Sequence, residues 1–428
     1  MVGASETIVA LSSGTPPAAI GIIRVSGPRA RVALSQLTGR EFVPREARLA
    51  KLRDDGGALL DEALVLYFQG PSSATGEDLV ELHCHGGRAV LAAVERALVA
   101  MPGIRAASPG EFTRRAFANG RIDLAQAEGL ADLLSAETEL HRAAALANTS
   151  GALSAQISAW RDEVLRLSAQ IEAVLDFSDE EDASDLPTGF AESIGTLVQN
   201  MEEWLVRPRA ERLGEGYRVV LAGPPNSGKS TLFNALVESE AAITSPVAGT
   251  TRDVLERSVA IAGVPLCFVD TAGLRETDDD EIEAIGIGRA KEQMVAADLT
   301  LWLGEEGHGP RDSWEIAARE DAPDFAAKRS PRFTLSAATG SGMECFKMAL
   351  VEQARSSLPK PGEAALNARQ HALVSETAAA LLRARAPSDL LLIAEELRSA
   401  RASFDRLLGR ATTEDMLDAL FGRFCIGK

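Results

Sequence analysis

The 428-residue sequence contains no apolar run long enough to cross a membrane, so we expect no membrane-spanning segment. It has only four cysteines, and their scattered positions fit neither a zinc finger nor a disulfide scaffold: Cys84, Cys267, Cys345 and Cys425. The first residues lack the basic start and apolar stretch of a secretory signal. Together these absences predict a protein of the reducing cytoplasm.

The sequence also lacks an excess of positive charge. Its formal net charge is -18 at pH 7, which excludes a protein that coats nucleic acid by bulk electrostatics. Any contact with RNA must therefore use a local basic patch or be shared with a partner. Apolar residues make up 46% of the chain, which is typical of a globular protein, and the length allows roughly two to four domains.

The pattern of residues changes three times along the chain. Residues 1–118 mix β-branched residues with glycine turns, which predicts an α+β domain. Residues 119–213 are helical, residues 214–358 alternate short apolar runs with glycine-rich turns, and residues 359–428 are helical again. We therefore expect a multidomain protein in which an α/β domain is inserted into an all-α domain that is split in the sequence.

The first helical region carries an apolar seam with alternating spacings of four and three residues, and this seam favours a helix packed in a bundle over a free coiled coil. Its members are Leu153, Ile157, Trp160, Val164, Leu167, Ile171 and Val174. The second helical region offers leucines that are available to pack: Leu381, Leu382, Leu390, Leu391, Leu392, Leu397 and Leu407.

A phosphate-binding loop stands in the stretch YRVVLAGPPNSGKST. A strand is expected over Arg218 to Ala222, and the loop Gly223-x-x-x-x-Gly228-Lys229-Ser230 then leads into a helix. Glycines allow backbone N–H groups to turn toward phosphate oxygens, and the helix N-terminus adds its dipole. We expect Lys229 to reach the β- and γ-phosphates and the Ser230 hydroxyl to bind Mg²⁺.

Two further stretches follow in the order that is typical of a GTPase with two switches. In AGTTRDV, Thr250 and Thr251 stand where a switch loop closes over Mg²⁺ and the γ-phosphate. The apolar strand of LCFVDTAG ends at Asp270, which suits a Mg²⁺-bound water, and Gly273 has an N–H group placed to sense the γ-phosphate. Leu274 stands where a water-orienting glutamine is expected, so another group must take that role, and the carboxylates of RETDDDEIEAIG are candidates.

The guanine-binding motif Asn-Lys-x-Asp is incomplete. The best-placed residues after the strand of DLTLWLG are Ala318-Arg319-Glu320-Asp321, in which the aspartate is kept and the asparagine is an alanine. Ser336 and Ala337 in TLSAATG offer a loop for a backbone contact with the base. Two interpretations of Asp321 stay open: an acceptor for guanine N1 and N2, or an ordinary surface carboxylate. The residues from Gly304 to Arg332 look short and irregular.

Together the motifs resemble the tRNA modification GTPases called MnmE or TrmE, over essentially the whole chain. The resemblance rests on IGIIRVSGP (Ile20 to Pro28), GEDLVELHCHGG (Gly76 to Gly87), SPGEFTRRAFANGRIDLAQAEGLADL (Ser108 to Leu133), GPPNSGKS, AGTTRDV, DTAGLRE and the terminal FCIGK. It implies an N-terminal domain that binds a tetrahydrofolate derivative (the 5-formyl or 5,10-methylene form) and forms a homodimer. It also implies a split helical domain and an inserted Ras-like GTPase domain.

The resemblance implies a function as well. With the flavoprotein MnmG (GidA), in a heterotetrameric or larger complex, such a protein adds an aminomethyl or carboxymethylaminomethyl group to C5 of the wobble uridine of certain tRNAs. GTP hydrolysis is activated by potassium while two GTPase domains dimerise. Asn226 is similar to the potassium-binding asparagine of the family, and Ser245, Val247 and Thr250 match the positions that complete the coordination. Glu283 matches the glutamate that orients water.

The resulting nucleotide site is expected to comprise the following residues. They are Asn226, Ser227, Gly228, Lys229, Ser230, Thr231, Ser245, Pro246, Val247, Ala248, Gly249, Thr250, Thr251, Asp270, Thr271, Ala272, Gly273, Asp321, Ser336 and Ala337. Within this set Ser230 and Thr251 are the expected Mg²⁺ ligands, and Glu283, Lys229 and Asn226 are the residues expected to act in hydrolysis.

The resemblance assigns folate binding to Arg24, Glu81, Arg121 and Lys428. Strand alternation in DLVELHCH directs Glu81, His83 and His85 to one face. A carboxylate there can accept paired N–H bonds from a pterin ring. A metal site formed by the same three residues, and histidines that only satisfy local hydrogen bonds, are the other interpretations.

The terminal FCIGK has two interpretations. Gly427 and Lys428 can simply end a helix, with the glycine as its cap. By resemblance the tail reaches the folate pocket, where Gly427 allows a close backbone approach. Cys425 is then either a small packing residue or a thiolate nucleophile. A ribosome-assembly GTPase acting as a binding switch is the alternative function, but it predicts a basic RNA-binding module after the GTPase domain, and the N-terminal motifs would be unexplained.

Overall fold

In the computed structural model, the described residues are 6–176, 186, 188–238, 241–242, 255–271, 292–323, 325, 327–385 and 389–428. The chain divides into two units. The first comprises Met1–Ala131 with Asp405–Lys428, and the second comprises Asp132–Phe404. Within the described ranges, no helix is both long and apolar enough to span a bilayer.

The first unit is built on a six-stranded sheet with the order β3-β4-β5-β2-β1-β6. Its strands are β1 (Thr7–Leu11), β2 (Ile20–Ser26), β3 (Arg48–Arg53), β4 (Leu59–Phe68), β5 (Leu79–His85) and β6 (Ile104–Ala106). Helices α1 (Ala30–Thr38) and α2 (Arg88–Val99) contribute to one core with residues that alternate along the strands, such as Ile23 and Val25. Because alternate side chains of a strand point to opposite faces, Arg24 is directed away from this core.

Three more helices belong to the first unit in whole or in part: α3 (Glu111–Ala118), α4 (Leu124–Ser135) and α14 (Glu414–Phe421). Phe421 and Phe424 pack with Phe117 and with Ala127 of α4 in a small apolar cluster. Segments from both ends of the sequence therefore form one core.

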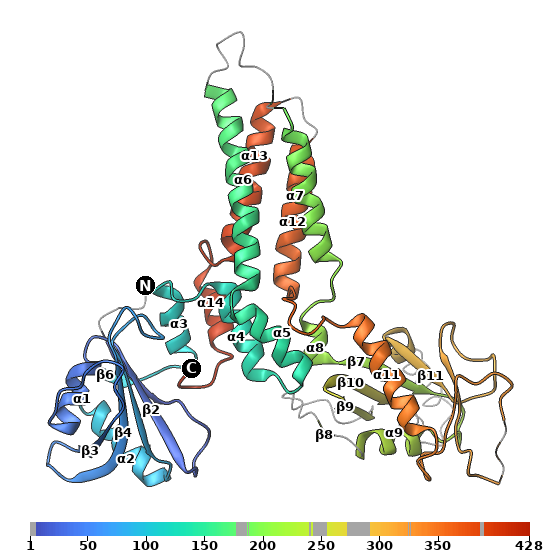
Figure 1. The fold of residues 1–428 in the computed structure, drawn as a ribbon, viewed down its shortest axis with the longest axis horizontal. Coiled ribbons are helices and arrows are strands. Elements are labelled where there is room, and N and C mark those ends of the chain that lie inside the picture. The colour runs from blue at the N-terminus through green and yellow to red at the C-terminus, as the bar shows by residue number, and fades with distance from the viewer. Residues whose placement is uncertain are drawn as a thin grey trace, which may run out of the picture. The chain divides into compact units, whose positions relative to one another are not determined.

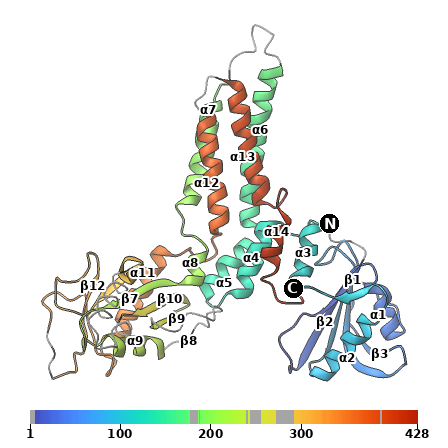
Figure 2. The ribbon, with the colours of Figure 1, turned by 180° about the vertical axis from the view of Figure 1, so that it is seen from behind.

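The second unit contains a long helical bundle. Its helices are α5 (Glu139–Thr149), α6 (Ala152–Asp176), α7 (Phe190–Leu205), α8 (Glu211–Glu215), α12 (Ala368–Ala384) and α13 (Leu390–Leu407). Figures 1 and 2 show α6, α7, α12 and α13 running side by side. Trp160 of α6 contacts the rings of Trp204 and Phe404, at centroid distances of 5.8 and 6.3 Å.

The predicted seam of α6 is confirmed, since Leu153, Ile157, Trp160, Val164, Leu167 and Ile171 are buried and only Val174 is half-buried. Of the C-terminal leucines that are available to pack, three do not. Leu382, Leu391 and Leu392 are 46%, 66% and 57% exposed, whereas Leu381, Leu397 and Leu407 are buried. The helical period explains the difference, because consecutive residues point about 100° apart and cannot all face one core.

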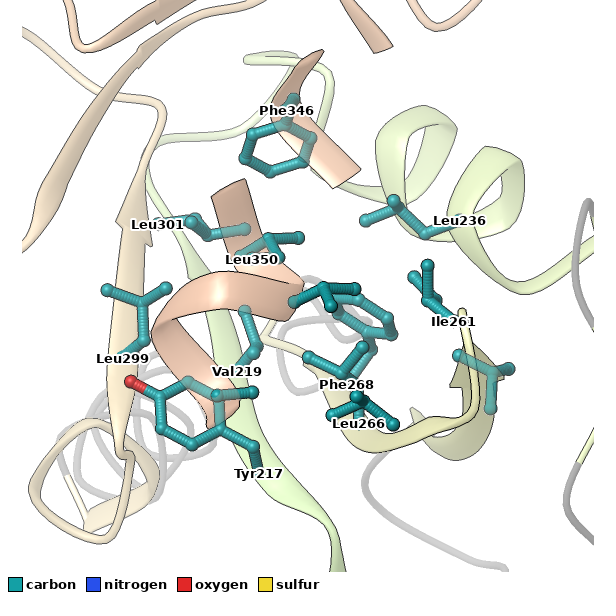
Figure 3. Packing of buried hydrophobic residues seen from close by; sticks show 14 of the residues in the cluster. Tyr217, Val219, Leu236, Ile261, Leu266, Phe268, Leu299, Leu301, Phe346 and Leu350 are labelled. Atoms are coloured by element: carbon teal, nitrogen blue, oxygen red, sulfur yellow. The ribbon is translucent and has the colours of Figure 1, made fainter. Parts of the chain in front are cut away.

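The α/β part of the second unit is a seven-stranded sheet with the order β13-β12-β11-β7-β10-β9-β8. Its strands are β7 (Tyr217–Ala222), β8 (Ala241–Ala242), β9 (Leu255–Ile261), β10 (Val264–Asp270), β11 (Leu299–Trp302), β12 (Trp314–Ala317) and β13 (Phe333–Thr334). Helices α9 (Lys229–Glu238) and α11 (Met343–Ser357) share a core with the sheet. Figure 3 shows Phe268 of β10 in this core, with Val219 of β7 and Leu350 of α11 among its labelled neighbours.

The connections on both sides of β12 contain no helix in the residues that the structure describes between β11 and β13. Parallel strands are usually joined through a helix, so both connections are unusual. They confirm the irregular stretch expected from Gly304 to Arg332. Both connections begin at the carboxyl ends of strands, the sheet edge at which ligands of open α/β sheets bind.

The predicted fold class is confirmed: an α+β N-terminal part, helices from two separate stretches of sequence, and an α/β part between them.

Candidate functional site

The phosphate loop, residues Gly223 to Ser230, connects the buried strand β7 to helix α9. Gly223 has φ +151, and a Cβ there would lie 2.9 Å from the backbone nitrogen of Gly304. Lys229 is buried, and its Nζ donates to the carbonyls of Gly223 at 3.0 Å and of Pro224 at 2.7 Å. The loop therefore has the tight turn and the inward-directed ammonium group that phosphate binding requires.

Ser230 and Asp270, both assigned to magnesium from the sequence, meet beside this loop. The Ser230 Oγ donates to Oδ2 of the fully buried Asp270 at 2.7 Å, which joins the start of α9 to the end of β10. Thr271 fixes the end of β10 through a 2.8 Å bond from its hydroxyl to the Leu221 carbonyl. A hydroxyl and a carboxylate at one point supply the hard oxygen ligands that Mg²⁺ prefers, so the residues fit this ion. Thr231 is exposed on the first turn of α9.

The base loop, residues Ala318 to Asp321, follows β12. The Ser336 hydroxyl donates to Asp321 Oδ1 at 2.5 Å, and this hydrogen bond lowers the pKa of the Asp321 carboxyl below its usual 3.8. Ser336 also accepts from the Thr339 backbone nitrogen at 3.1 Å. Asp321 is thus oriented by the loop that carries Ser336 and Ala337, and it remains exposed to a ligand.

Arg319 is a residue of this site that the sequence interpretation did not assign. Its Nη1 donates to the backbone oxygen of Asn226 at 3.0 Å, so it links the base loop to the phosphate loop. A basic residue two positions before Asp321 was the available signal, because it occupies the lysine position of Asn-Lys-x-Asp.

Several expected site residues lie outside the described residues. They are Ser245, Pro246, Val247, Ala248, Gly249, Thr250, Thr251, Ala272, Gly273 and Glu283. Their assignments remain predictions.

In the first unit, Arg24 and Glu81 form an ion pair across the neighbouring strands β2 and β5. The Arg24 Nη2 and Nε donate to Oε1 of Glu81 at 2.7 and 3.1 Å. The Phe112 ring lies 5.8 Å from the Arg24 guanidinium carbon. The other carboxylate oxygen of Glu81 lies 3.6 Å from Nε2 of His83. This pairing sets a guanidinium and a carboxylate side by side on the sheet face opposite α1 and α2.

The predicted alternation of β5 is confirmed, with Val80, Leu82 and Cys84 buried. His85 is exposed and its Nδ1 lies 2.7 Å from Oδ1 of Asp61. Among the described residues no three His, Cys, Asp or Glu side chains are placed to hold a metal ion. The hydrogen-bond interpretation therefore accounts for His85, and nothing in the described chain supports the metal interpretation.

The C-terminal tail packs on strand β1. A Cβ on Gly427, which has φ +96, would lie 2.1 Å from the Leu11 carbonyl oxygen, and the Ser12 hydroxyl donates to the Gly427 carbonyl at 2.8 Å. The interpretation of Gly427 as a helix cap is wrong, because α14 ends at Phe421 with Gly422 as its C-cap. Cys425 is exposed, so its interpretation as a buried packing residue is also wrong.

The remaining expected folate residues, Arg121 and Lys428, lie in other segments of the first unit. Arg121 is exposed just after α3, and its Cγ would lie 3.3 Å from a Cβ on Gly76. Lys428 is half-buried, one residue beyond the Gly427 contact with β1. The described contacts thus join two of the four expected residues, Arg24 and Glu81, in a direct ion pair.

An ionic network fixes α3 on the sheet. Glu111 accepts from Arg105 at 2.6 Å and from Arg115 at 3.0 Å, and Arg115 also contacts Glu77. Burial opposes ionisation of Glu111, but the bonds from Arg105, the Ser108 backbone and Arg115 outweigh it and lower the pKa from 4.5 to about 2. Because Arg115 is buried in this network, its guanidinium is not exposed for a contact with RNA.

Two family models match the chain. "GTP-binding protein TrmE N-terminus" matches residues 7–121, and "MnmE helical domain" matches residues 124–425. A protein of Erythrobacter litoralis named tRNA modification GTPase MnmE is 61% identical over 99% of this chain and 100% of its own length. A protein of Novosphingobium aromaticivorans with the same name is 61% identical, again over 99% of this chain and 100% of its own length.

A solved structure, the G domain of the Thermotoga maritima FeoB iron transporter, is 23% identical over 32% of this chain and 98% of that chain. The TM-score is 0.24, too low to support a conclusion.

Proposed function

Because the chain belongs to the MnmE family of tRNA modification GTPases, we propose that it hydrolyses GTP to drive modification of the wobble uridine of certain tRNAs. The product carries an aminomethyl or carboxymethylaminomethyl group at C5, and the carbon comes from a folate one-carbon unit. The proposal of GTP hydrolysis is supported by one contact above all. The phosphate loop contacts the end of β10, where the Ser230 hydroxyl donates to Asp270 at 2.7 Å.

In this proposal the phosphate loop binds the triphosphate through its backbone N–H groups and through Lys229. Ser230 and Thr251 would bind Mg²⁺, and Asp270, which accepts from Ser230, would hold a water of the ion. Bound there, the ion would supply positive charge against the charge that develops on the phosphate oxygens. Lys229 is already directed into the loop, since its Nζ donates to two loop carbonyls. Because the side chain is buried, water competes little with phosphate oxygens for its ammonium group.

Potassium activation is part of the proposal. Asn226, Ser245, Val247 and Thr250 would bind the ion, and Glu283 would orient the attacking water. Among the described residues, Asn226 supports the potassium proposal, because it is exposed on the phosphate loop, where its backbone has φ +60. A monovalent cation near the β- and γ-phosphates supplies the positive charge that an arginine finger supplies in other GTPases.

Folate binding is assigned to Arg24, Glu81, Arg121 and Lys428. The Glu81 carboxylate suits the paired N–H donors of a pterin ring, and the basic residues suit a carbonyl or the glutamate tail of the cofactor. The ion pair between Arg24 and Glu81 supports this assignment, since it orients the carboxylate before a ligand arrives. The 5-formyl and 5,10-methylene forms are the proposed ligands.

The proposed organisation follows from the same family. Residues 1–118 would bind folate and form a homodimer, residues 119–213 and 359–428 would form the helical domain, and residues 214–358 would form the GTPase domain. The proposed partners are tRNA and the flavoprotein MnmG (GidA), in the cytoplasm. The exposed Cys425 is the proposed residue for thiolate chemistry near the one-carbon unit. No specific observation favours the ribosome-assembly alternative.

The test is the rate of GTP hydrolysis by the full chain in potassium and in sodium chloride at equal ionic strength, with ATP as a second substrate. We expect hydrolysis of GTP to be several times faster in potassium, and ATP to be a poor substrate. Equal GTP rates in both salts would remove the potassium mechanism, and equal rates with ATP would remove guanine specificity.

A further inference from the structure

His83 and Glu81 lie on the same face of β5, because residues two positions apart in a strand point the same way. On one side of β5 is β2, where Ile22 pairs with His83 and Arg24 pairs with Glu81. On the other side is β4, where Leu64 pairs with His83. The His83 ring therefore stands between two aliphatic side chains, and the Glu81 carboxylate is its polar neighbour along the strand.

The two oxygens of the Glu81 carboxylate have different surroundings. Oε1 accepts both described bonds from Arg24, at 2.7 and 3.1 Å. Arginine often binds a carboxylate with one donor on each oxygen, so this one-sided pairing leaves Oε2 without a donor from Arg24. The Nε2 atom of His83 lies 3.6 Å from this second oxygen. The Glu81 side chain is still 17% exposed, so a ligand can reach the carboxylate.

The Nε2 atom of His83 is buried and has no hydrogen-bond partner in the described part of the chain. A buried polar atom without a partner costs free energy, so a small shift that provides one is favoured. A movement of about half an ångström would bring Nε2 to the usual hydrogen-bond distance from Oε2. Because Nε2 is buried while the side chain as a whole is 22% exposed, this nitrogen can act on a ligand only through Glu81.

We propose that His83 is a positioning residue for the folate site, whose Nε2–H donates to Oε2 of Glu81 and directs this carboxylate toward the ligand. The proposal rests on the proposed function, in which Glu81 binds the pterin ring. Arg24 holds one oxygen and His83 holds the other, so the carboxylate is oriented before the ligand arrives. A carboxylate has about four acceptor sites, so acceptor capacity remains for the ligand.

The first test is the affinity of the full chain for 5-formyltetrahydrofolate, measured by isothermal titration. His83→Leu removes the donor and keeps an apolar side chain that suits its aliphatic neighbours, whereas His83→Gln keeps an N–H donor at the end of the side chain. His85→Leu is the matched control, because His85 lies on the same face of β5 but its described ion pair is with Asp61.

We expect His83→Leu to weaken folate binding roughly tenfold, the usual effect of losing a hydrogen bond to a charged group. His83→Gln should restore much of the affinity, and His85→Leu should bind as the unchanged protein does. Rescue by glutamine separates loss of the donor from a general disturbance of the sheet, which both substitutions would share. Full folate affinity in His83→Leu would overturn the proposal.

The contact between His83 and Glu81 has a second readout that needs no ligand. With isotope-labelled histidine, magnetic resonance shows which ring nitrogen carries the proton at about pH 8, where an ordinary imidazole is neutral. The chain has five histidines, and the signal of His83 is assigned by its loss in His83→Gln. We expect the proton on Nε2, with a change in the Nε2 signal in Glu81→Gln. A proton on Nδ1, or the same signal in Glu81→Gln, would overturn the proposal.

Failure of the proposed folate function gives a different result. In that case the unchanged protein itself shows no binding of 5-formyltetrahydrofolate. The magnetic resonance signal of the ligand-free chain still decides whether His83 donates to Glu81, so the two failures are distinguishable.

Discussion

Substitution of Gly427 by alanine should detach the C-terminal tail from strand β1 while leaving the GTPase part intact. The left-handed backbone at φ +96 costs a residue with a Cβ about 1–2 kcal/mol. The new methyl group would lie 2.1 Å from the Leu11 carbonyl oxygen, an overlap that tight packing relieves only at a further cost of about 1–3 kcal/mol. Loss of the bond from Ser12 to the Gly427 carbonyl adds about 1 kcal/mol.

The summed cost of keeping an alanine in place is roughly 3–6 kcal/mol. Release of the tail avoids most of this cost and also returns about 1–2 kcal/mol of backbone entropy for each residue that is freed. The tail should therefore swing away rather than unfold the unit, and Lys428 should leave the proposed folate site. We expect the affinity for 5-formyltetrahydrofolate, measured by isothermal titration, to fall at least about tenfold, with unchanged GTP hydrolysis.

Gly57→Ala is the matched control. Gly57 lies in the same unit with φ +82, but an added Cβ would meet nothing within 4 Å. This variant carries the backbone cost without the overlap and should bind folate as the unchanged protein does. If Gly427→Ala retained full folate affinity, the placement of the tail in the folate site would be refuted.

Three further predictions concern other parts of the molecule. Because the pKa of Glu111 is lowered to about 2 in the folded chain, its contribution to stability is complete above pH 4.5 and is lost as pH falls toward 2. The urea midpoint of unfolding should therefore drop between pH 6 and pH 3, and Glu111→Gln should reduce that drop. Equal drops in both proteins would contradict this prediction. Asp270→Asn should weaken magnesium-dependent GTP hydrolysis at least about 100-fold, because an amide is a poorer partner for the ion and its water; wild-type magnesium dependence would count against the assignment. Cys425→Ser should abolish tRNA modification but not GTP hydrolysis if the thiolate acts in the chemistry, and retained modification would rule that role out.

Local patterns in the sequence predict the elements that depend on neighbouring residues. The alternation of β5 follows from a period of two residues and the buried seam of α6 from the helical period, and burial agrees with both. The strand before the phosphate loop is instead a short apolar run that is buried almost throughout. The meeting of Ser230 with Asp270 is predictable too, because the phosphate loop and the second switch have a fixed order in this class of fold.

Such local patterns do not predict contacts between residues that are far apart in the sequence. The bond from Ser12 to Gly427 joins residues 415 positions apart, and the bond from Arg319 to Asn226 joins residues 93 positions apart. Each depends on how a loop turns at the edge of a sheet, which neither periodicity nor composition specifies. The exposure of Leu391 and Leu392 has a simpler cause, since the helical period places them on a face of α13 that does not point into the core.

The most direct test of the central claim is reconstitution of the modification. The full chain would be incubated with MnmG, an unmodified tRNA, a folate one-carbon donor and GTP, and the nucleosides would be analysed by mass spectrometry. We predict a C5-aminomethyl or carboxymethylaminomethyl uridine that forms only when GTP can be hydrolysed and the folate donor is present. The same yield with a non-hydrolysable GTP analogue, or without folate, would contradict the account.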